Sequence, residues 1–413
     1  MSAIIEIHPP LNNWHANAVL PASKSLSNRW LILEALSKNT IVVDGHSDAE
    51  DTVRLQEIIR NKPVIADAGA GGTTFRFALA YLCTCEGYEG TMRGSVRLHE
   101  RPVKPLVDAL LALGADINYL EKEGFPPLAV RGKNMKGGQI HLSAEISSQF
   151  LSAILLIAPA LQEPLTIHTG NKITSRPYLD MTLALLQHAG QQVEEKEGTF
   201  TVYPKPWSSG RFKVEKDWSS ASYWYALAAL SPGANIFLPG LQLDSLQGDA
   251  HTAKLFAIYG VNSEEKSNGI QLTNSGQVPD SFEFDFRQQP DLAQTMAVVV
   301  AGLKKQALFS GLDTLRRKET DRIQALRNEL AKLDVITSEP REGELMIDAT
   351  NARCDKELIV DTYDDHRMAL AFAALSLTQY RLQIRDPEVV KKSYPGFWTE
   401  LRKAGFHLKV EES

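Results

Sequence analysis

Apolar positions along the chain repeat one compound pattern, in which an amphipathic helix is followed by a short turn and an apolar strand. The pattern covers residues 106–117, 179–193, 252–261, 322–336 and 397–408. Its turn positions, 114, 190, 260, 334 and 405, lie 70 to 76 residues apart. Such regular spacing in a chain of 413 residues predicts about six similar units, rather than the scattered helix–strand junctions of any α/β protein.

The turn residue is glycine at four of these junctions and Asp334 at the fifth. Glycine takes positive φ without strain and commonly ends helices. Further helices are expected over 30–36, 150–158, 219–230, 292–303 and 369–377. Strands are expected over 40–43, 128–130, 139–142, 165–168, 200–203, 234–238 and 344–347. This alternation predicts an α/β or α+β fold.

The length of the chain predicts two domains, because single cores stop growing at roughly 250–300 residues. A connection between them is expected at 213–217, before the helix over 219–230. The net charge of −6 argues against a protein that mainly coats nucleic acid or an anionic membrane. Any anion that binds must therefore meet a local cluster of Lys and Arg.

Targeting and redox features of the sequence are sparse. Three cysteines, Cys83, Cys85 and Cys354, argue against a disulfide framework or a zinc site and favour a reducing cytoplasm. The longest apolar run, 151–161, is interrupted by Ser152 and Pro159 and is too short to span a membrane. No signal peptide is evident, and nothing in the sequence requires more than a monomer.

Cationic side chains gather where several predicted helices begin. Lys24, Ser25 and Arg29 crowd one turn at the start of the helix over 30–36. The glycine-rich segment 67–76 also precedes a helix, but it lacks the P-loop lysine and the dinucleotide-binding spacing. Arginines at 93, 97 and 101 occupy a segment that suits a mobile loop. Each feature alone is compatible with a solvated surface, whereas together they favour anion binding at helix N-termini.

The highest density of charge lies at 316–322, where four cations flank Glu319. In a helix Lys318 and Arg322 would be a like-charge pair one turn apart, which is destabilising unless an anion neutralises it. Arg367, just inside another helix start, faces the positive end of the helix dipole. Both features indicate a bound anion.

Some polar residues at helix starts have simpler interpretations. Ser148 and Ser175 are explained by helix capping when taken alone. Asp365 can also cap a helix, and His366 is expected to be held by a neighbour rather than by a metal. Asp291, after Pro290, is either a cap or a positioned base. With many cationic helix starts, the chain should hold an electropositive cleft in which Asp291 and Glu319 could move protons.

Ten short motifs resemble those of one known family over nearly the whole chain. They are Ser-Lys24-Ser25-x-Ser-Asn-Arg29, Gly72-Thr73-x-x-Arg76, Arg97-x-x-x-Arg101-Pro, Ser147-Ser148-Gln149-Phe, Ser175-x-Pro-Tyr178, Gln247-Gly248-Asp249, Pro-Asp291, Lys318-Glu319-Thr-Asp-Arg322, Asp365-His-Arg367-Met and Lys392-Ser-Tyr-Pro. In number, order and spacing these motifs are similar to those of the EPSP synthase (3-phosphoshikimate 1-carboxyvinyltransferase) family of enolpyruvyl transferases.

The resemblance implies a two-domain inverse α/β barrel with six βαβαββ units, three in each domain. Residues 22–214 would form the N-terminal lobe, residues 1–21 and 215–413 the C-terminal lobe, and the active site would lie in the cleft between them. The implied reaction transfers the enolpyruvyl group of phosphoenolpyruvate to the 5-hydroxyl of shikimate 3-phosphate, in the shikimate pathway. Neither a metal nor an organic cofactor is implied.

The resemblance also assigns roles by motif position. Shikimate 3-phosphate would be held by Lys24, Ser25, Arg29, Ser147, Ser148, Gln149, Ser175, Asp291 and Lys318. Phosphoenolpyruvate would be held by Lys24, Gly72, Arg97, Gln149, Arg322, Arg367 and Lys392. Asp291 would accept the hydroxyl proton and Glu319 would protonate the methylene carbon, with Lys24 as a third catalytic residue.

Three positions depart from the family pattern, namely Ala22, Ala70 and Thr314, where Gly, Asn and Asn are usual. These departures are expected to leave the reaction unchanged and to bear on loop geometry, phosphoenolpyruvate affinity and inhibitor sensitivity. One alternative is the related transferase that acts on UDP-N-acetylglucosamine, but the reactive cysteine expected there is absent from 88–101. A non-catalytic phosphometabolite-binding protein of the same fold is a second alternative, and the presence of both Asp291 and Glu319 argues against it. An RNA-end-processing relative is disfavoured by the net charge.

Overall fold

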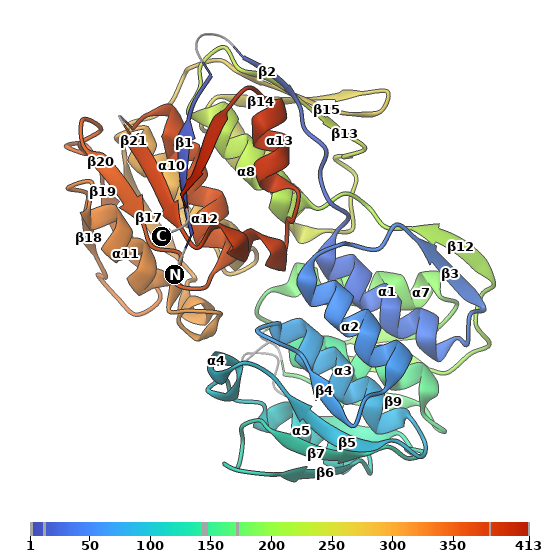
Figure 1. The fold of residues 1–413 in the computed structure, drawn as a ribbon. Coiled ribbons are helices and arrows are strands. Elements are labelled where there is room, and N and C mark those ends of the chain that lie inside the picture. Colours follow the sequence, from blue (N-terminus) through green and yellow to red (C-terminus); the bar gives the residue numbers. More distant parts are fainter. Residues whose placement is uncertain (1–2, 11–13, 143–147, 171–172, 380, 412–413) are drawn as a thin grey trace. The chain divides into compact units, whose positions relative to one another are not determined.

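The computed structural model describes residues 3–10, 14–142, 148–170, 173–379 and 381–411. Its chain divides into two compact units. The N-terminal unit is Ala22–Val214, and the C-terminal unit is Met1–Pro21 together with Glu215–Ser413 (Figure 1). The chain passes from one unit to the other after Pro21 and again after Val214.

Five sheets in the described residues share one topology. Four of them follow the chain order strand, helix, strand, helix, strand, strand, and in the fifth the fourth strand is supplied by β1 (Ile4–His8) from the start of the chain. The first two strands are parallel, and the fourth pairs antiparallel with both the second and the third. Across each sheet the order is therefore first, second, fourth, third. This topology confirms the βαβαββ unit that the regular spacing of the turns and the family resemblance predict.

The C-terminal unit contains three of these sheets. The first comprises β2 (His15–Asn17), α8 (Trp218–Ala229), β13 (Asn235–Pro239), α9 (Thr252–Ala257), β14 (Val261–Lys266) and β15 (Gly269–Asn274). The second comprises β16 (Ser281–Asp285), α10 (Ala293–Gly302), β17 (Gln306–Ser310), α11 (Arg322–Ala331), β18 (Ile336–Ser338) and β19 (Leu345–Asp348). The third comprises β20 (Glu357–Val360), α12 (His366–Phe372), β21 (Arg381–Arg385), α13 (Phe397–Lys403), β22 (His407–Glu411) and β1 (Ile4–His8).

The N-terminal unit contains the other two four-stranded sheets and a smaller one. One comprises β4 (Ile65–Asp67), α3 (Gly72–Thr84), β5 (Glu89–Arg93), α5 (Lys104–Ala112), β6 (Asp116–Tyr119) and β7 (Leu128–Arg131). Another comprises β8 (Gly138–His141), α6 (Ser148–Ile157), β9 (Leu165–His168), α7 (Arg176–His188), β10 (Gln192–Lys196) and β11 (Thr199–Tyr203). The small sheet pairs β12 (Gly210–Lys213) with β3 (Ile41–Asp44), beside α1 (Lys24–Leu36) and α2 (Glu50–Asn61).

Each unit is completed by strands from distant parts of its sequence. Strand β1 is an inner strand of the last sheet of the C-terminal unit, where Ile5 pairs with Ile384 on one side and Val410 on the other. Strand β2 is the first strand of the sheet that continues at β13. In the N-terminal unit β12, which comes last in the chain, pairs with β3. Both units are thus closed by backbone hydrogen bonds between their ends.

The predicted turn residues end their helices in the expected conformation. Gly114, Gly190, Gly260 and Gly405 have φ between 79° and 95°, and Asp334 has φ of 59°. Left-handed backbone of this kind lets the chain leave the helix and enter the following strand. Aspartate tolerates it better than most side chains do, which explains the fifth junction.

Some predicted boundaries are wrong. The helix expected over 369–377 is α-helical only to Phe372 and continues as the 3₁₀ helix η5 (Ala373–Leu377). The pattern over 252–260 is helical only to Ala257. The segment 93–102, expected as a loop, contains α4 (Val96–His99), because Ser95 accepts a hydrogen bond from the amide of Leu98 and caps that turn.

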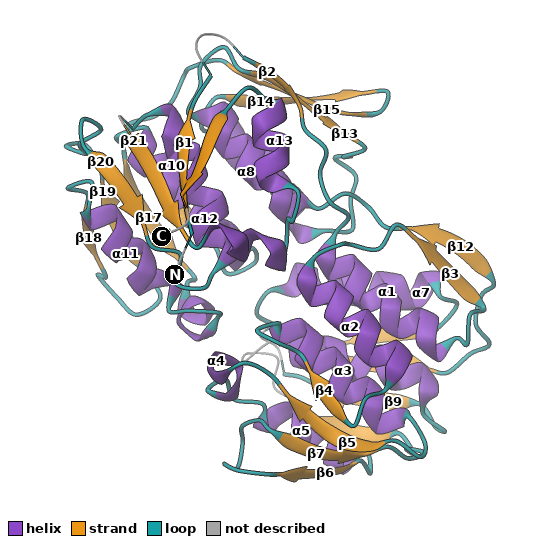
Figure 2. Ribbon diagram, viewed as in Figure 1, coloured by secondary structure: helices purple, strands orange, loops and turns teal. Residues whose placement is uncertain are grey.

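Three helices lie at the centre of the apolar interior of the C-terminal unit, and the buried faces of the strands complete it. Helices α8, α10 and α12 contact one another, and strands lie outside them (Figure 2). Eleven of the twelve residues of α8 are buried, including Trp218 and Trp224. A helix that is buried all round needs no polar stripe, which explains its continuous apolar sequence. No helix within the described ranges is long and apolar enough to cross a lipid bilayer.

Glu6 fixes β1 within its sheet. Its carboxylate accepts hydrogen bonds from Arg381 Nη2 at 2.6 Å and Gln383 Nε2 at 3.2 Å, and the residue is 5% exposed. The bond from Arg381 outweighs the effect of burial and lowers the pKa of the Glu6 carboxyl from 4.5 to about 2. Folding therefore favours the charged carboxylate.

Glu6→Gln is expected to lower the free energy of unfolding by about 1 kcal/mol at pH 7, because the ion pair with the partly exposed Arg381 is lost. The folded pKa lies below the unfolded one, so this contribution is present above pH 4.5 and is lost as the pH falls toward 2. Urea denaturation of both proteins at pH 7 and pH 3 measures the difference. An equal difference at both pH values would contradict the assignment.

Candidate active site

Asp291 lies at the centre of a group of cations in the C-terminal unit. It belongs to the 3₁₀ helix η3 (Pro290–Leu292), directly before α10. Its Oδ1 lies 2.9 Å from Arg322 Nη1 and 3.5 Å from Lys318 Nζ, and its Oδ2 lies 2.8 Å from Arg367 Nη2. The starts of α11 and α12 therefore bring two arginines to one carboxylate.

Arg322 in turn joins three carboxylates. Its Nε donates to Asp365 Oδ2 at 2.7 Å and its Nη2 to Glu319 Oε2 at 2.8 Å, in addition to the bond with Asp291. The residue is 1% exposed. Burial alone would lower the pKa of Arg322, but the charges of Asp365, Glu319 and Asp291 outweigh it, so the pKa is raised. Arg322 thus holds a permanent charge and orients both predicted proton-transfer residues.

We call the connected set Asp291, Lys318, Glu319, Arg322, Asp365 and Arg367 the Arg322 cluster. Its geometry corrects two inferences from the sequence. Lys318 is extended, with φ of −90° and ψ of −154°, so it forms no helical like-charge pair with Arg322. The protein itself also supplies anions here, because the three carboxylates of Asp291, Glu319 and Asp365 balance the three cations of the cluster.

The start of α12 is organised by Asp365. Its carboxylate accepts a hydrogen bond from the amide of Arg367 at 2.9 Å, which confirms the predicted cap. His366 Nδ1 lies 3.8 Å from the same carboxylate. Asp364, the residue before Asp365, contacts Lys392 at the end of the 3₁₀ helix η6 (Pro387–Lys392). Lys392 Nζ donates to the carbonyl oxygen of Asp364 at 2.6 Å and to its Oδ1 at 2.5 Å. The last helix, α13, begins at Phe397, as the pattern over 397–408 predicts.

In the N-terminal unit, Lys24 is the first residue of α1, which Ser23 caps. Its Nζ lies 2.8 Å from Asp51 Oδ2. The carbonyl oxygen of Asp51 accepts a hydrogen bond from Thr74 Oγ1 at 2.7 Å, so this acidic residue lies beside the first turn of α3. Asp51 follows Lys24 by 27 residues and belongs to none of the recognised motifs, so the sequence did not identify it.

The start of α3 is crowded by two arginines. A Cβ placed on Gly72 would lie 2.4 Å from Arg76 Nη1 and 2.6 Å from Arg101 Nη2. Arg76 Nη1 also donates to Gln149 Oε1 at 3.0 Å, and both arginines are about 5% exposed. Here the close approach of these two guanidinium groups, rather than the backbone conformation, favours glycine. Both arginines stand in recognised motifs but were given no role.

Arg29 lies inside the N-terminal unit. It donates four hydrogen bonds, to the carbonyl oxygens of Ser25 and Tyr178 and to the hydroxyls of Thr182 and Ser152. Burial lowers the pKa of Arg29 to about 10. These bonds tie α1 to α6 and α7, so Arg29 supports the helices that carry the neighbouring predicted residues.

The remaining predicted residues have different surroundings. Arg97, on α4, pairs with Glu100 at 2.7 Å and is about 40% exposed in its side chain. Ser148 is the buried first residue of α6. Ser175 has φ of 57° and its side chain does not cap α7, so the capping interpretation is wrong there. Ser147 lies outside the described residues.

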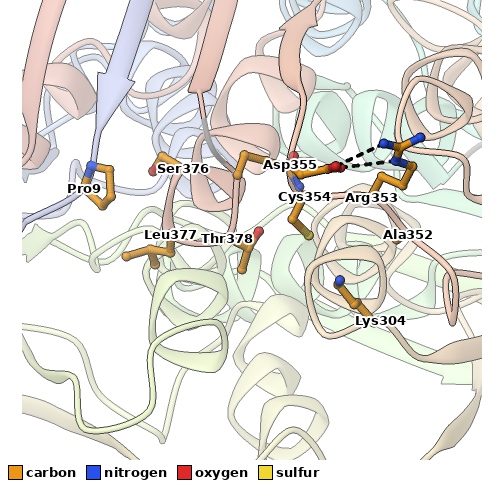
Figure 3. Close-up of a pocket in the computed structure, with 10 residues that line it drawn as sticks. Pro9, Lys304, Ala352, Arg353, Cys354, Asp355, Ser376, Leu377 and Thr378 are labelled. Atoms are coloured by element: carbon orange, nitrogen blue, oxygen red, sulfur yellow. Dashed lines mark hydrogen bonds and ion pairs between the residues drawn. The ribbon is translucent and has the colours of Figure 1, made fainter.

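A separate cavity of about 670 Å³ opens on the C-terminal unit (Figure 3). It is lined by Pro9, Lys304, Ala352, Arg353, Cys354, Asp355, Ser376, Leu377, Thr378 and Gln379. Arg353 pairs with Asp355 across its rim, at 3.0 Å. Lys304 follows the C-terminal end of α10, whereas Asp291 precedes its N-terminal end, so the cavity is distinct from the Arg322 cluster.

Solved structures share the fold of this chain. One is EPSP synthase from Acinetobacter baumannii, with a TM-score of 0.78, 20% identity and coverage of 99% of this chain and 100% of that one. Another is the enolpyruvyl transferase NikO from Streptomyces tendae, with a TM-score of 0.75, 15% identity and coverage of 100% and 99%. The fold is therefore that of the enolpyruvyl transferases, as the sequence predicts.

Sequence comparison narrows this class. A 3-phosphoshikimate 1-carboxyvinyltransferase from Bacteroides fragilis strain YCH46 is 43% identical over 398 residues, 96% of this chain and 97% of the relative. One from Aliivibrio salmonicida is 34% identical over 95% and 98%. The family model for EPSP synthase (3-phosphoshikimate 1-carboxyvinyltransferase) matches residues 54–401. The chain therefore belongs to the EPSP synthase family, which confirms the transferase activity that its motifs predicted.

Gly72→Ala should lower kcat/KM for enolpyruvyl transfer by about 10²-fold, because the added methyl group displaces the guanidinium groups of Arg76 and Arg101. Steady-state phosphate release measures the effect. Gly396→Ala is the matched control, since its nearest neighbour is a Tyr394 carbon at 4.0 Å. Wild-type kcat/KM in the Gly72 variant would contradict this role for the arginines.

Proposed function

We propose that the protein transfers the enolpyruvyl group of phosphoenolpyruvate to the 5-hydroxyl of shikimate 3-phosphate and releases phosphate. One observation carries the proposal: Asp291 and Glu319 accept hydrogen bonds from two nitrogens of the same buried guanidinium, that of Arg322. Two carboxylates that are held by the same guanidinium group can act on the same substrates. A reaction that removes a proton from one atom and adds a proton to another requires such a pair.

The chemistry needs a base and an acid at different atoms. The hydroxyl oxygen forms a bond to C2 of phosphoenolpyruvate while C3 gains a proton and becomes a methyl group. The C2–O bond to phosphate then breaks as the methyl group returns a proton, which restores the methylene group. In our proposal Asp291 accepts the hydroxyl proton and passes it to the departing phosphate, while Glu319 gives a proton to C3 and takes one back.

Both substrates carry a phosphate and a carboxylate, so binding requires several cations. We assign phosphoenolpyruvate to Lys24, Gly72, Arg97, Gln149, Arg322, Arg367 and Lys392. We assign shikimate 3-phosphate to Lys24, Ser25, Arg29, Ser147, Ser148, Gln149, Ser175, Asp291 and Lys318. Support comes from the motifs and from the density of cations in the Arg322 cluster.

The proposal requires residues of both units to act on one pair of substrates. Lys24 and Gln149 belong to the N-terminal unit, whereas Asp291, Glu319 and Arg322 belong to the C-terminal unit. Lys24, paired with Asp51, would add a cation near the reacting atoms. Substrate-driven closure of two lobes is a general means of assembling such a site and excluding water.

Glu319→Gln and Asp291→Asn should each lower kcat by about 10²- to 10⁴-fold, the range typical of general acid–base residues. The amide replacements keep the shape of the side chain and remove its proton-transfer capacity. Phosphate release measures kcat, and circular dichroism verifies folding. Glu283→Gln, on an exposed position of β16, is the matched control. Wild-type turnover in either site variant would refute its role.

The identity of the acceptor substrate is tested by supplying two candidate acceptors in separate assays. Purified protein with phosphoenolpyruvate should release phosphate when shikimate 3-phosphate is added. UDP-N-acetylglucosamine in its place should give no release, because the mobile-loop cysteine expected of that related transferase is missing from 88–101. Release with UDP-N-acetylglucosamine alone would assign the protein to that alternative.

We also infer a monomeric enzyme of the cytoplasm that needs no cofactor. The sparse cysteines Cys83, Cys85 and Cys354 support a reducing compartment. Sedimentation of the purified protein would test the monomer, with a mass of 45.7 kDa expected.

A further inference from the structure

The loop between β20 and α12 has an unusual backbone. Two consecutive residues, Tyr363 and Asp364, have φ of 53° and 55°. This left-handed region is uncommon outside glycine and especially so for a bulky side chain, and it costs of order 1–3 kcal/mol for each residue. The surrounding structure must therefore hold this loop in place.

Glu329 supplies much of that support. It is a fully buried residue of α11. Its Oε1 accepts a hydrogen bond from the Tyr363 hydroxyl at 2.7 Å, and its Oε2 accepts one from the amide of Asp361 at 3.1 Å. Lys332 Nζ lies 2.7 Å from Oε2 and balances the charge. One carboxylate thus binds both the loop backbone and a side chain of the left-handed pair.

The Tyr363 hydroxyl remains a donor at any ordinary assay pH. Burial and the hydrogen bond to Glu329 raise the pKa of Tyr363 to about 12. Asn328 Nδ2 lies 3.4 Å from the same oxygen. The contact between Tyr363 and Glu329 is therefore a charge-assisted hydrogen bond between a fully buried carboxylate and a partly exposed tyrosine.

Helix α11 holds the loop at two points. Arg322 and Glu329 are seven residues apart, which places them on the same face of the helix, about 10 Å apart along its axis. Arg322 binds Asp365 at the end of the loop, and Glu329 binds Tyr363 nearer its beginning. Because both anchors lie on one rigid helix, the loop conformation is fixed relative to the Arg322 cluster.

The loop between β20 and α12 carries two carboxylates, Asp364 and Asp365, that contact residues of the site. Asp364 contacts Lys392, and Asp365 contacts Arg322 and the amide of Arg367. A change at Tyr363 would therefore alter the surroundings of Lys392, Arg322 and Arg367 together, although no hydrogen bond described above joins Tyr363 to any of them.

We propose that Glu329, acting through Tyr363, is a positioning residue that sets the orientation of Lys392, Arg322 and Arg367 toward phosphoenolpyruvate. This inference rests on the proposed function, because it uses the assignment of these three cations to that substrate. It concerns residues that touch neither substrate nor reacting atoms, so their effect is on binding geometry rather than on proton transfer.

The test is Tyr363→Phe, which removes the hydroxyl and keeps the ring. The KM for phosphoenolpyruvate should rise about tenfold or more, the lower end of the scale of a lost hydrogen bond to a charged group. The KM for shikimate 3-phosphate should stay within about twofold, and kcat should fall less than the KM rises. Tyr203→Phe is the matched control, because Tyr203 donates to Glu194 at 3.3 Å on the surface of the N-terminal unit.

A second variant separates positioning from general loosening. Glu329→Gln keeps one oxygen that can accept from Tyr363, but it replaces the other oxygen, which accepts from the amide of Asp361 and pairs with Lys332, by an NH2 donor. It should therefore raise the KM for phosphoenolpyruvate at least as much as Tyr363→Phe does, again with the KM for shikimate 3-phosphate within about twofold. An unchanged KM for phosphoenolpyruvate in Tyr363→Phe, or an equal rise of both KM values, would overturn the inference. Failure of the wild-type protein to release phosphate from the two substrates would instead overturn the proposed function.

Discussion

The site of the C-terminal unit depends on one buried guanidinium shared by three carboxylates. Arg322 is almost fully excluded from solvent, so its charge is tolerable only because Asp291, Glu319 and Asp365 surround it. Removing one partner from a buried ion pair typically costs about 3–5 kcal/mol. The same constraint fixes the rotamers of the two carboxylates assigned to proton transfer. Electrostatic stability and catalytic preorganisation therefore come from the same contacts.

The repeated unit explains how such contacts arise from distant sequence. In the C-terminal unit the helices pack against one another inside the sheets, and η3, α11 and α12 bring their first residues together. Helix N-termini offer free amides and the positive end of a dipole, and the added Arg and Lys side chains increase that field. The large apolar content of α8 and α10 is the counterpart of this arrangement, since these helices have no solvent-facing side.

The periodic features of the fold were predictable because they are local. A glycine at position 114 or 190 ends its helix whatever its tertiary neighbours are, and the motifs identified the family. The pairing of Lys24 with Asp51, the burial of Arg29 and the extended backbone of Lys318 depend on packing between segments far apart in sequence. Charge patterns alone suggested an external anion near Arg322, because the sequence cannot show that an internal aspartate lies beside it.

The position of β1 in the last sheet affects the order in which the two units can fold during synthesis. Residues 22–214 are contiguous, and their elements are all available once that stretch has left the ribosome. In contrast Ile4–His8 pairs with Arg381–Arg385 and with His407–Glu411, which are synthesised long after it. Strand β1 must therefore remain without its partners until residues 381–411 have been synthesised. A chain that stops short of β22 leaves this inner strand of the last sheet as an exposed edge, which favours aggregation.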